Sequence, residues 1–255
     1  MRVAVMTPTF NERDNIDEFV RRTRAAVPDA HIFVVDDASP DGTGERVIEL
    51  AASDPLLSLM SRDSARGYAA ASRDGLSRIS TQGFDAIVTI DCDLSHDPRD
   101  IPMLLEALSR GADVAIGSRY VPGGGVRNWP LSRRLLSLWG NWYTSFMLGL
   151  GVRDCTSGFR AYRSEVVRSG VVAATTSDGY SFLTEVLYRL RGGFVGAGGA
   201  PDEHVRWRIT EVPIIYTERV AGESKMNKTI ISESMRRVTR WGLRRLMSQV
   251  QLRRR

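Results

Sequence analysis

Residues 86–93 read AIVTIDCD, an apolar run that ends in two carboxylates, Asp91 and Asp93. A β-branched run of this kind is typical of a buried strand in a parallel sheet. Open α/β sheets bind their ligands at the carboxyl ends of such strands. Two carboxylates this close repel each other unless a divalent cation lies beside them, and Mg²⁺ in proteins commonly takes one or two carboxylates together with substrate phosphates. The pattern therefore predicts a parallel sheet and indicates a nucleotide-diphosphate substrate.

On either side of this strand, short apolar runs alternate with amphipathic segments. The expected strands are 3–6, 32–35, 56–60, 86–90 and 114–116, and the expected helices are 15–26, 43–52, 65–79 and 101–108. This βαβ rhythm predicts an α/β fold in which a doubly wound, mostly parallel sheet is flanked by helices.

The second half of the chain has a different pattern. After a glycine-rich loop, the expected elements are a long aromatic helix at 131–150, a hairpin within 154–162, a helix at 181–190, a strand at 209–214 and a basic helix at 230–250. We expect one large domain over 1–228, followed by a basic amphipathic C-terminal helix and tail over 229–255.

Composition restricts the class of protein. The chain has 255 residues, of which 42% are hydrophobic, and this suits a globular domain with a substantial core. The two cysteines, Cys92 and Cys155, indicate neither a disulfide framework nor a metal knuckle, so we expect a reducing, cytoplasmic setting. We recognise no signal peptide at residues 1–6, and no apolar run approaches the roughly 20 residues of a membrane span.

The net charge of +5 is concentrated at the C-terminal end, where no acidic residue follows Glu233. Eight arginines follow it: Arg236, Arg237, Arg240, Arg244, Arg245, Arg253, Arg254 and Arg255. Such a segment predicts an anionic partner, either a membrane surface or nucleic acid. The aromatic stacking platforms of single-strand binders are not evident nearby, so we expect no nucleic-acid partner.

The 230–250 helix also places apolar residues on one face. They are Ile231, Met235, Val238, Trp241, Leu246 and Val250. An apolar face bordered by arginines is more typical of an interfacial helix at a membrane than of a core helix.

Polar motifs follow four of the expected strands. They are PTFNE at 8–12, VDDASPDGT at 35–43, DCDLSHDP at 91–98 and GSRY at 117–120. Because parallel strands end at one edge of a sheet, we expect these motifs to converge. Pro8 and Phe10 are placed to flank a base, Asp37 to accept from a base or ribose, and Asp93 to hold a metal.

In this order and spacing, the motifs resemble family 2 glycosyltransferases of the GT-A fold. Later segments narrow the resemblance to dolichol- or polyprenol-phosphate mannosyltransferases: NWP at 128–130, RR at 133–134, Asp154 with TSGFR at 156–160, GY at 179–180 with Phe182 and Glu185, and GESKM at 222–226. The resemblance extends to about Trp241. It implies that residues 1–228 form a GT-A catalytic domain.

The resemblance also implies a reaction, an inverting transfer of mannose from GDP-mannose to a polyprenyl or dolichyl monophosphate. The cofactor would be Mg²⁺ or Mn²⁺. The acceptor phosphate is already ionised at neutral pH, so no strong general base is required. Two alternatives remain open: the same scaffold with UDP-glucose or another nucleotide-sugar donor, and a non-enzymatic module that binds an anionic membrane or nucleic acid.

Site residues carried over from the family fall into overlapping groups. The donor group is Pro8, Phe10, Glu12, Val35, Asp37, Asp91, Cys92, Asp93, Ser95, Arg119, Arg219 and Lys225. The acceptor-phosphate group is Arg119, Arg133 and Ser137. Asp93 and Ser95 would hold the metal, Asp91 would face the nucleotide, and Asp93 and Arg119 are the expected catalytic residues.

Two positions and one loop depart from the family. Ser95 stands where relatives often have Gln, which puts its direct metal coordination in doubt. Ala69 stands where a second glycine is usual at the start of the 65–79 helix, and residues 195–207 add an extended loop.

A lipid acceptor requires contact with a membrane. The 131–150 helix could line a groove for the lipid through Leu135, Leu138, Trp139, Trp142, Phe146 and Leu150, although a core helix or a dimer face fits its pattern equally well. We expect the protein to associate peripherally with the cytoplasmic face of an anionic membrane, or to rely on a membrane-bound partner.

Overall fold

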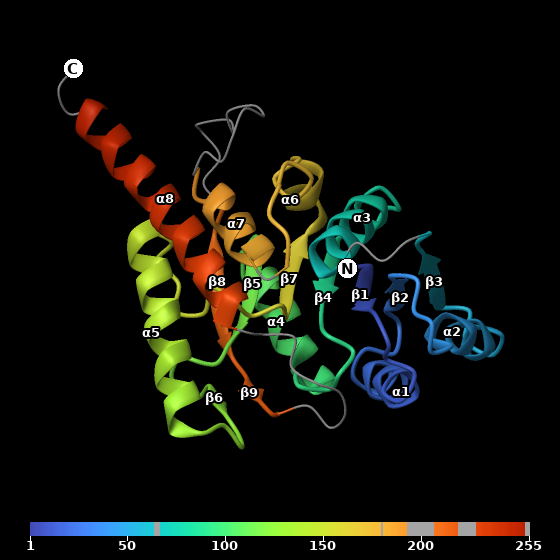
Figure 1. Cartoon of the computed structure of the whole chain (residues 1–255). Coiled ribbons are helices and arrows are strands. Elements are labelled where there is room, and N and C mark those ends of the chain that lie inside the picture. The colour runs from blue at the N-terminus through green and yellow to red at the C-terminus, as the bar shows by residue number, and fades with distance from the viewer. Residues whose placement is uncertain (64–66, 180, 193–206, 219–227, 253–255) are drawn as a thin grey trace.

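The computed structural model describes residues 1–63, 67–179, 181–192, 207–218 and 228–252. Figure 1 shows a central sheet with helices packed on both of its faces. Across the sheet, the strands follow the order β3 (Leu57–Ser61), β2 (His31–Asp36), β1 (Val3–Thr9), β4 (Ala86–Thr89), β7 (Arg160–Arg163), β5 (Val114–Ser118) and β8 (Ile209–Pro213). Neighbouring strands are parallel except where β7 pairs with β4 and β5. The predicted α/β fold with a mostly parallel sheet is confirmed.

Both faces of the sheet are buried because successive side chains of each strand point to opposite sides. In β2, Ile32 and Val34 pack with α1 (Ile16–Ala26), α2 (Thr43–Ala51) and α4 (Ile101–Ser109) in one core. Phe33 and Val35 face the other core, which includes residues of α3 (Tyr68–Ser80), α6 (Ser164–Arg168) and α7 (Ser181–Leu190). This two-sided burial explains why the strands read as continuous apolar runs.

Helix α3 lies very close to the sheet at Gly75. A Cβ atom at this position would be 2.6 Å from the Met6 sulfur and 2.7 Å from a methyl carbon of Val35. Only a residue without a side chain allows this approach, so Gly75 helps to fix the distance between α3 and strands β1 and β2.

The predicted hairpin within 154–162 is wrong. Residues 160–163 form β7, which lies antiparallel between β4 and β5 inside the main sheet. Its side chains alternate between the cores, with Ala161 in one and Tyr162 in the other. Arg160 is fully buried and donates hydrogen bonds to the backbone carbonyls of Ser157, Leu183 and Cys155. The turn residues before β7 therefore form a loop and not the tip of a hairpin.

A second, two-stranded sheet pairs β6 (Gly125–Val126) with β9 (Ile215–Tyr216) in parallel. Strand β9 follows β8 of the main sheet, and β6 follows the loop that leaves β5. The sequence did not indicate this small sheet, because two-residue strands have no measurable periodicity.

Helices α5 (Leu131–Leu148) and α8 (Lys228–Leu252) lie side by side at one end of the sheet, as Figure 1 shows. A Cβ atom added at Gly242 of α8 would be 2.6 Å from the methyl carbon of Met147 on α5. Val238 and Trp241 are buried in the core, where the Trp241 ring stacks on Tyr188 at 6.0 Å. The predicted membrane-facing side of α8 is therefore wrong at these two residues, because neighbouring helices cover them.

Helix α5 instead exposes its large apolar side chains. The exposed residues are Leu131, Leu135, Leu136, Leu138, Trp139, Trp142 and Phe146, and the fractions for Trp142 and Phe146 are 60% and 68%. A core helix would have buried them, so that alternative for α5 is excluded. In the described part of the chain, no helix has the length and hydropathy needed to span a bilayer.

Candidate active site

A pocket of about 560 Å³ opens at the carboxyl edge of the sheet, beside the ends of β1, β2 and β4. Seven residues predicted for the donor site line it: Pro8, Phe10, Glu12, Asp37, Asp91, Cys92 and Asp93. They converge because the three strands are parallel neighbours. The structure thus brings together residues that are up to 85 positions apart in the chain.

Other walls of this pocket come from residues that the sequence did not indicate. They are Gly67, Tyr68, Ala71, Asp178, Ser181, Glu233, Ser234 and Arg237, whereas Thr9 and Gly179, which also line the pocket, belong to motifs identified in the sequence. Glu233, Ser234 and Arg237 belong to α8, where hydrogen bonds fix Ser234 to Ser181 (2.9 Å) and Arg237 to Ser177 (2.9 Å). The helix that we expected to face a membrane therefore also closes the pocket.

Backbone strain is concentrated in the loops around this pocket. Among described non-glycine residues, positive φ angles occur at Asn11 (61°), Ala38 (58°), Leu94 (58°) and Asn128 (62°). Asn11 and Ala38 lie two residues after the ends of β1 and β2, and Leu94 lies five residues after the end of β4. For Ala and Leu such angles cost on the order of 1 kcal/mol each, and they persist only where the surrounding structure enforces them.

Asp37 is held in place by donors on both of its carboxylate oxygens. One oxygen accepts from the Arg62 guanidinium, and the other accepts from the backbone N–H of Gly67 at 2.6 Å. Each carboxylate oxygen has more than one lone pair, so the group can still accept from a base or a ribose. Its orientation is fixed before any ligand arrives.

Asp91 and Asp93 both line the pocket but differ in environment. Asp93 as a whole residue is 3% exposed, and its carboxylate accepts from the backbone N–H of Ser95 at 3.0 Å. The Asp91 side chain is 26% exposed, and its carboxylate lies 3.9 Å from Nδ1 of His96. Among the described residues, no group of three or more His, Cys, Asp or Glu side chains is arranged to hold a metal. Two carboxylates at a pocket nevertheless fit Mg²⁺ or Mn²⁺, because such ions complete their coordination with water and phosphate oxygens.

Cys92, between the two carboxylates, is a buried thiol. Burial raises the pKa of Cys92 well above its ordinary value, and the charges of Glu12, Asp93 and Asp91 raise it further. The thiol therefore stays protonated, and its role is to fill space behind the carboxylates.

Three of the described residues predicted for the donor do not line the pocket: Val35, Ser95 and Arg119. Val35 is part of the core on β2, and Ser95 is 1% exposed. Ser95 instead borders a second pocket of about 750 Å³, which is lined by residues such as Arg22, Arg99 and Arg127. Although this second pocket is larger, it contains neither the strand-end carboxylates nor the predicted base-binding residues, so we place the active site in the smaller one.

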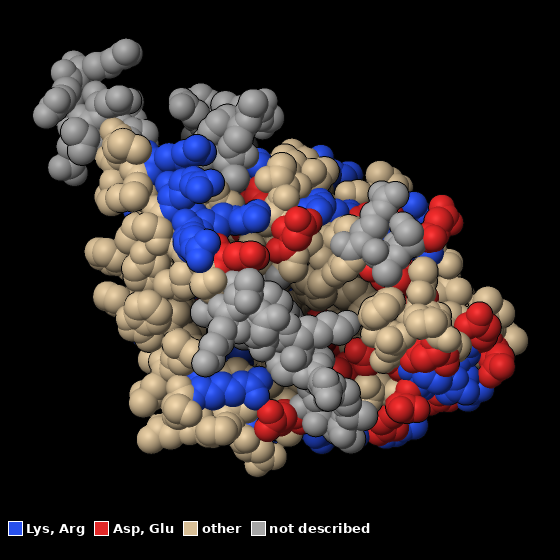
Figure 2. Space-filling view, in the orientation of Figure 1, with Lys and Arg blue, Asp and Glu red and all other residues tan. Residues whose placement is uncertain are grey.

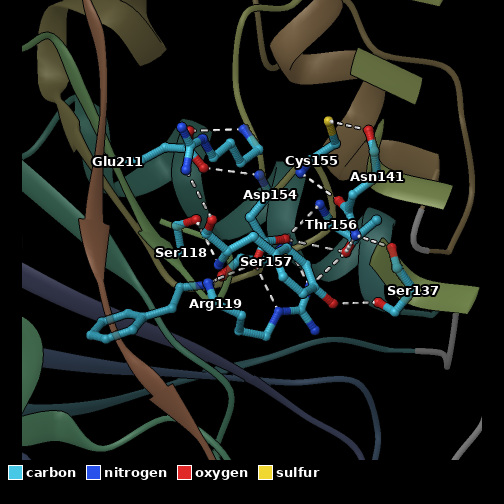
Figure 3. A network of polar contacts seen from close by, with 12 residues as sticks. Ser118, Arg119, Ser137, Asn141, Asp154, Cys155, Thr156, Ser157 and Glu211 are labelled. Carbon is cyan, nitrogen blue, oxygen red and sulfur yellow. Dashed lines mark hydrogen bonds and ion pairs between the residues drawn. The ribbon is translucent and has the colours of Figure 1, made fainter. Parts of the chain in front are cut away.

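Arg119 is buried and paired with Asp154, as Figure 3 shows. Its Nε and Nη2 atoms each donate to the Asp154 carboxylate at 2.7 Å, and Nη2 also donates to the Thr156 hydroxyl at 2.7 Å. Burial alone would raise the pKa of Asp154, but the charge and hydrogen bonds of Arg119 outweigh it and hold the pKa below its ordinary value. Asp154 was recognised as part of a motif, and the structure assigns it this ion pair.

Arg133 and Ser137, the other predicted acceptor residues, lie on α5 next to Arg119. The Arg133 guanidinium is 4.2 Å from the centre of the Trp129 ring, and that of Arg119 is 5.8 Å from the same ring. Ser137 accepts a hydrogen bond from the Tyr120 hydroxyl at 2.6 Å. The structure thus brings the three predicted residues into one cluster.

This arginine cluster, Arg119, Arg133 and Ser137, is connected to the loop before β7 through Asn141. The Asn141 amide donates to the Ser137 carbonyl at 2.9 Å and accepts from the Cys155 N–H at 2.7 Å (Figure 3). Glu211 on β8 accepts from the backbone N–H of Asp154 at 2.9 Å. The ion pair of Arg119 is therefore supported from two sides.

Some predicted residues lie outside the described residues. These are Arg219 and Lys225, together with most of the 195–207 insertion. Their assignment to the donor diphosphate stays a prediction.

The open α/β sheet and the pocket at its carboxyl edge are those of the GT-A class of glycosyltransferases. Residues 4–170 match the family described as Glycosyl transferase family 2. The chain belongs to glycosyltransferase family 2, and the protein is a glycosyltransferase, as the sequence motifs predicted.

Two curated relatives cover most of the chain. The first is a polyprenol monophosphomannose synthase of Mycolicibacterium smegmatis, 44% identical over 95% of this chain and 88% of that protein. The second is an undecaprenyl-phosphate mannosyltransferase of Micrococcus luteus, 43% identical over 95% of each chain. The resemblance to polyprenol-phosphate mannosyltransferases is confirmed.

A solved structure supports the fold. Glucosyl-3-phosphoglycerate synthase of Mycobacterium tuberculosis, crystallised with Mn²⁺, UDP and glucosyl-3-phosphoglycerate, aligns with a TM-score of 0.65. The alignment covers 96% of this chain and 79% of that chain at 19% sequence identity. At this identity the likeness shows the shared fold and nothing finer.

Proposed function

We propose that this protein transfers mannose from GDP-mannose to a polyprenyl monophosphate with inversion at the anomeric carbon. The similarity to two mannosyltransferases of polyprenol phosphates, at 43–44% identity over nearly the whole chain, carries this proposal. The site supports it, because a pocket with two carboxylates lies close to a cluster of cationic side chains. Family membership disfavours the alternative of a binding module without activity.

In the proposed reaction the pocket binds the donor. Pro8 and Phe10 flank the base, and Asp37 accepts a hydrogen bond from the base or ribose. Asp93 and Asp91 are the residues that would hold a divalent cation, which would offset the charge of the leaving diphosphate. Ser95 does not border the donor pocket, so it is the weaker candidate for a ligand. Arg219 and Lys225 are proposed to bind the donor diphosphate.

The arginine cluster is proposed to bind the acceptor phosphate. Arg119 directs Nε and Nη2 to Asp154, which leaves Nη1 for an anion. Arg133 is paired with Glu218 at 2.7 Å, and a phosphate would take the place of that carboxylate. The acceptor is already ionised, so the chain's task is to place the phosphate and neutralise charge rather than remove a proton.

We further propose that the apolar face of α5 contacts the anionic membrane that contains the acceptor, on its cytoplasmic side. Trp139, Trp142 and Phe146 are exposed on α5, and Leu243, Leu246 and Met247 are exposed on the neighbouring α8. Figure 2 shows basic side chains gathered along α8, and Arg236, Arg240 and Arg244 are its exposed arginines. Apolar side chains beside arginines match a surface that inserts between anionic headgroups. A membrane-bound partner on this face is the alternative occupant.

The decisive experiment is transfer from a panel of radiolabelled GDP- and UDP-sugars to a polyprenyl monophosphate, followed by mass analysis of the lipid. We expect label from GDP-mannose in a polyprenyl phosphate-hexose product. Transfer from UDP-glucose alone would overturn the choice of donor and keep the glycosyltransferase. Absence of any lipid product with every donor would overturn the proposed acceptor.

A further inference from the structure

The NWP motif comprises Asn128, Trp129 and Pro130, and it lies directly before α5 without a part in the proposed binding of donor or acceptor. Its backbone is fixed on both sides of the tryptophan. Asn128 has a φ of 62°, in the left-handed region that asparagine enters more readily than most residues. Pro130 is the N-cap residue of α5, and a proline disfavours a helical backbone at the residue before it. Because Arg127 N–H also donates to the Tyr216 carbonyl at 2.8 Å, the chain holds the tryptophan in a defined position.

Both arginines of the cluster contact the Trp129 ring. The Arg133 guanidinium is 4.2 Å from the ring centre and that of Arg119 is 5.8 Å from it, both within the roughly 6 Å over which an aromatic face attracts a cation. The Tyr216 ring packs edge-on against the same indole at 5.4 Å. Two like charges repel each other, and the negative face of an aromatic ring offsets part of that repulsion. Trp129 therefore helps both cations to occupy one small region.

The two arginines differ in how much they depend on this ring. Arg119 is fixed by its buried ion pair with Asp154, whether or not the ring is present. Arg133 is partly exposed, and among the described residues it has one ion pair, with Glu218 at 2.7 Å, and one aromatic contact, with Trp129. In the proposed reaction the acceptor phosphate takes the place of Glu218. Once that carboxylate has left, the indole is the contact that still holds the Arg133 guanidinium.

We propose that Trp129 is a positioning residue for the acceptor phosphate, whose indole face holds the Arg133 guanidinium beside Arg119 when the phosphate displaces Glu218. The ring acts through the guanidinium and does not touch the reacting atoms. Without the ring, the freed arginine side chain would sample many rotamers in solvent, and binding of the phosphate would have to restore their order. The inference rests on the proposed function, since it assumes that this cluster binds the acceptor. It requires that loss of the ring weakens acceptor binding and leaves donor binding unchanged.

Trp129→Leu and Trp129→Phe separate the aromatic face from apolar bulk. Leucine removes the face, whereas phenylalanine keeps a ring that can lie against the guanidinium. Phe84→Leu is the matched control, since the Arg2 guanidinium is 5.0 Å from the centre of the Phe84 ring. Phe84 lies two residues before β4, at the amino edge of the sheet and opposite to the site. The control therefore removes an aromatic ring from an arginine that is remote from the acceptor.

The test measures two dissociation constants for each protein by calorimetry, one for a short-chain polyprenyl monophosphate and one for GDP with Mn²⁺. We expect Trp129→Leu to weaken binding of the lipid phosphate roughly three- to thirtyfold, the range that one cation–π contact supplies, and to leave the constant for GDP unchanged. Trp129→Phe should keep most of the affinity, because a phenyl face also attracts a guanidinium. Phe84→Leu should change neither constant.

Arg133→Ala provides an independent check, because the ring is proposed to act through that guanidinium. In the Arg133→Ala background, Trp129→Leu should weaken binding of the lipid phosphate much less than it does in the wild type. Additive losses, an unchanged constant in Trp129→Leu, equal losses for GDP and the lipid phosphate, or a Trp129→Phe as weak as Trp129→Leu would each overturn the inference and leave the proposed function intact. A wild type that does not bind the lipid phosphate would overturn the proposed acceptor, and this inference with it.

Discussion

Asp93 is deeply buried and also lines the pocket. We therefore expect the loss of its negative charge to reduce activity more than the loss of any other charge in the site. Asp93→Asn keeps an oxygen for the Ser95 N–H but removes the negative charge that would hold a cation. We expect transfer activity to fall by roughly 10²- to 10³-fold, the usual effect of losing one preorganised electrostatic contact. The measurement is lipid-linked product formed per unit time at saturating Mn²⁺.

The matched control for Asp93 is Asp29→Asn. Asp29 is exposed and precedes β2 at the opposite edge of the sheet, so its charge is remote from the pocket. It should keep full activity. Equal activity of Asp93→Asn and wild type would contradict the metal assignment.

The buried ion pair of Asp154 and Arg119 predicts a specific dependence of stability on pH. Because the folded-state pKa of Asp154 lies below its ordinary value of 3.8, its contribution is complete above that value and is lost as the pH falls through the lowered pKa. Asp154→Asn leaves Arg119 buried without its counter-charge, which should cost about 3–5 kcal/mol at pH 6. Urea unfolding should show that the wild type and Asp154→Asn differ less in free energy of unfolding at pH 3 than at pH 6. A difference that stays constant would contradict a lowered pKa of Asp154 in the folded state, because equal pKa values in the folded and unfolded states leave its contribution independent of pH.

Two glycines within helices predict opposite effects of the same substitution. Gly75→Ala would place a methyl group 2.6 Å from the Met6 sulfur, so we expect it to lower the free energy of unfolding by roughly 1–3 kcal/mol. Gly140→Ala on α5 meets no atom within 4 Å and improves helix propensity, so it should raise stability by about 0.5–1 kcal/mol. Urea denaturation of the two variants tests both signs. A neutral Gly75→Ala would mean that α3 can move away from the sheet at little cost.

Helices α5 and α8 offer a matched pair of tryptophans. Trp142 is 60% exposed on α5, whereas Trp241 is 5% exposed on α8. Trp142→Ala should leave stability unchanged and weaken binding to anionic vesicles by roughly tenfold, since about 1.5–3 kcal/mol accompanies burial of a large apolar side chain. Trp241→Ala should instead lower the free energy of unfolding by about 3–5 kcal/mol through loss of core packing. Vesicle sedimentation and urea unfolding separate the two effects, and unchanged vesicle binding of Trp142→Ala would contradict the membrane role of α5.

At the scale of elements, the sequence predicted what depends on local periodicity. The expected strands and helices of the first half lie within a few residues of those observed, because each has an apolar pattern that the sheet simply buries. The environment of β7 and α8 depends instead on distant partners. Nothing within 160–163 reveals that β4 and β5 flank it, and an apolar face reads the same whether a membrane or another helix covers it.

At the scale of the molecule, the choice between donors is a question of which nucleotide binds the native state. GDP with Mn²⁺ at about a hundred times its dissociation constant should stabilise the protein by about 2.7 kcal/mol and raise its melting temperature. UDP with Mn²⁺ at the same concentration should have a much smaller effect. Stabilisation by UDP but not by GDP would contradict the proposed mannose donor.

The sequence predicted the part of the candidate site that is formed by the ends of the strands. Motifs after β1, β2 and β4 converge by the rule for parallel sheets, and this placed Asp37, Asp91 and Asp93 in one pocket. Glu233 and Arg237 were missed because α8 reaches the pocket only through its docking on other helices. The sequence of a helix shows which residues share a face, but it does not show whether that face packs on another helix, a pocket or a membrane.

The position of β7 has a consequence for the order in which the protein is made. The four strands β3-β2-β1-β4 are complete at Thr89, so the edge that presents Asp37, Asp91 and Asp93 can form early during synthesis. Strand β5 has no neighbour in the sheet until β7 emerges from the ribosome and joins it to β4, a delay of roughly two to nine seconds at about 5–20 residues per second. During that interval β4 and β5 each have an edge that is not paired with another strand, and their apolar residues are left partly uncovered. The nascent chain is therefore exposed to misassembly after the synthesis of β4 and before that of β7.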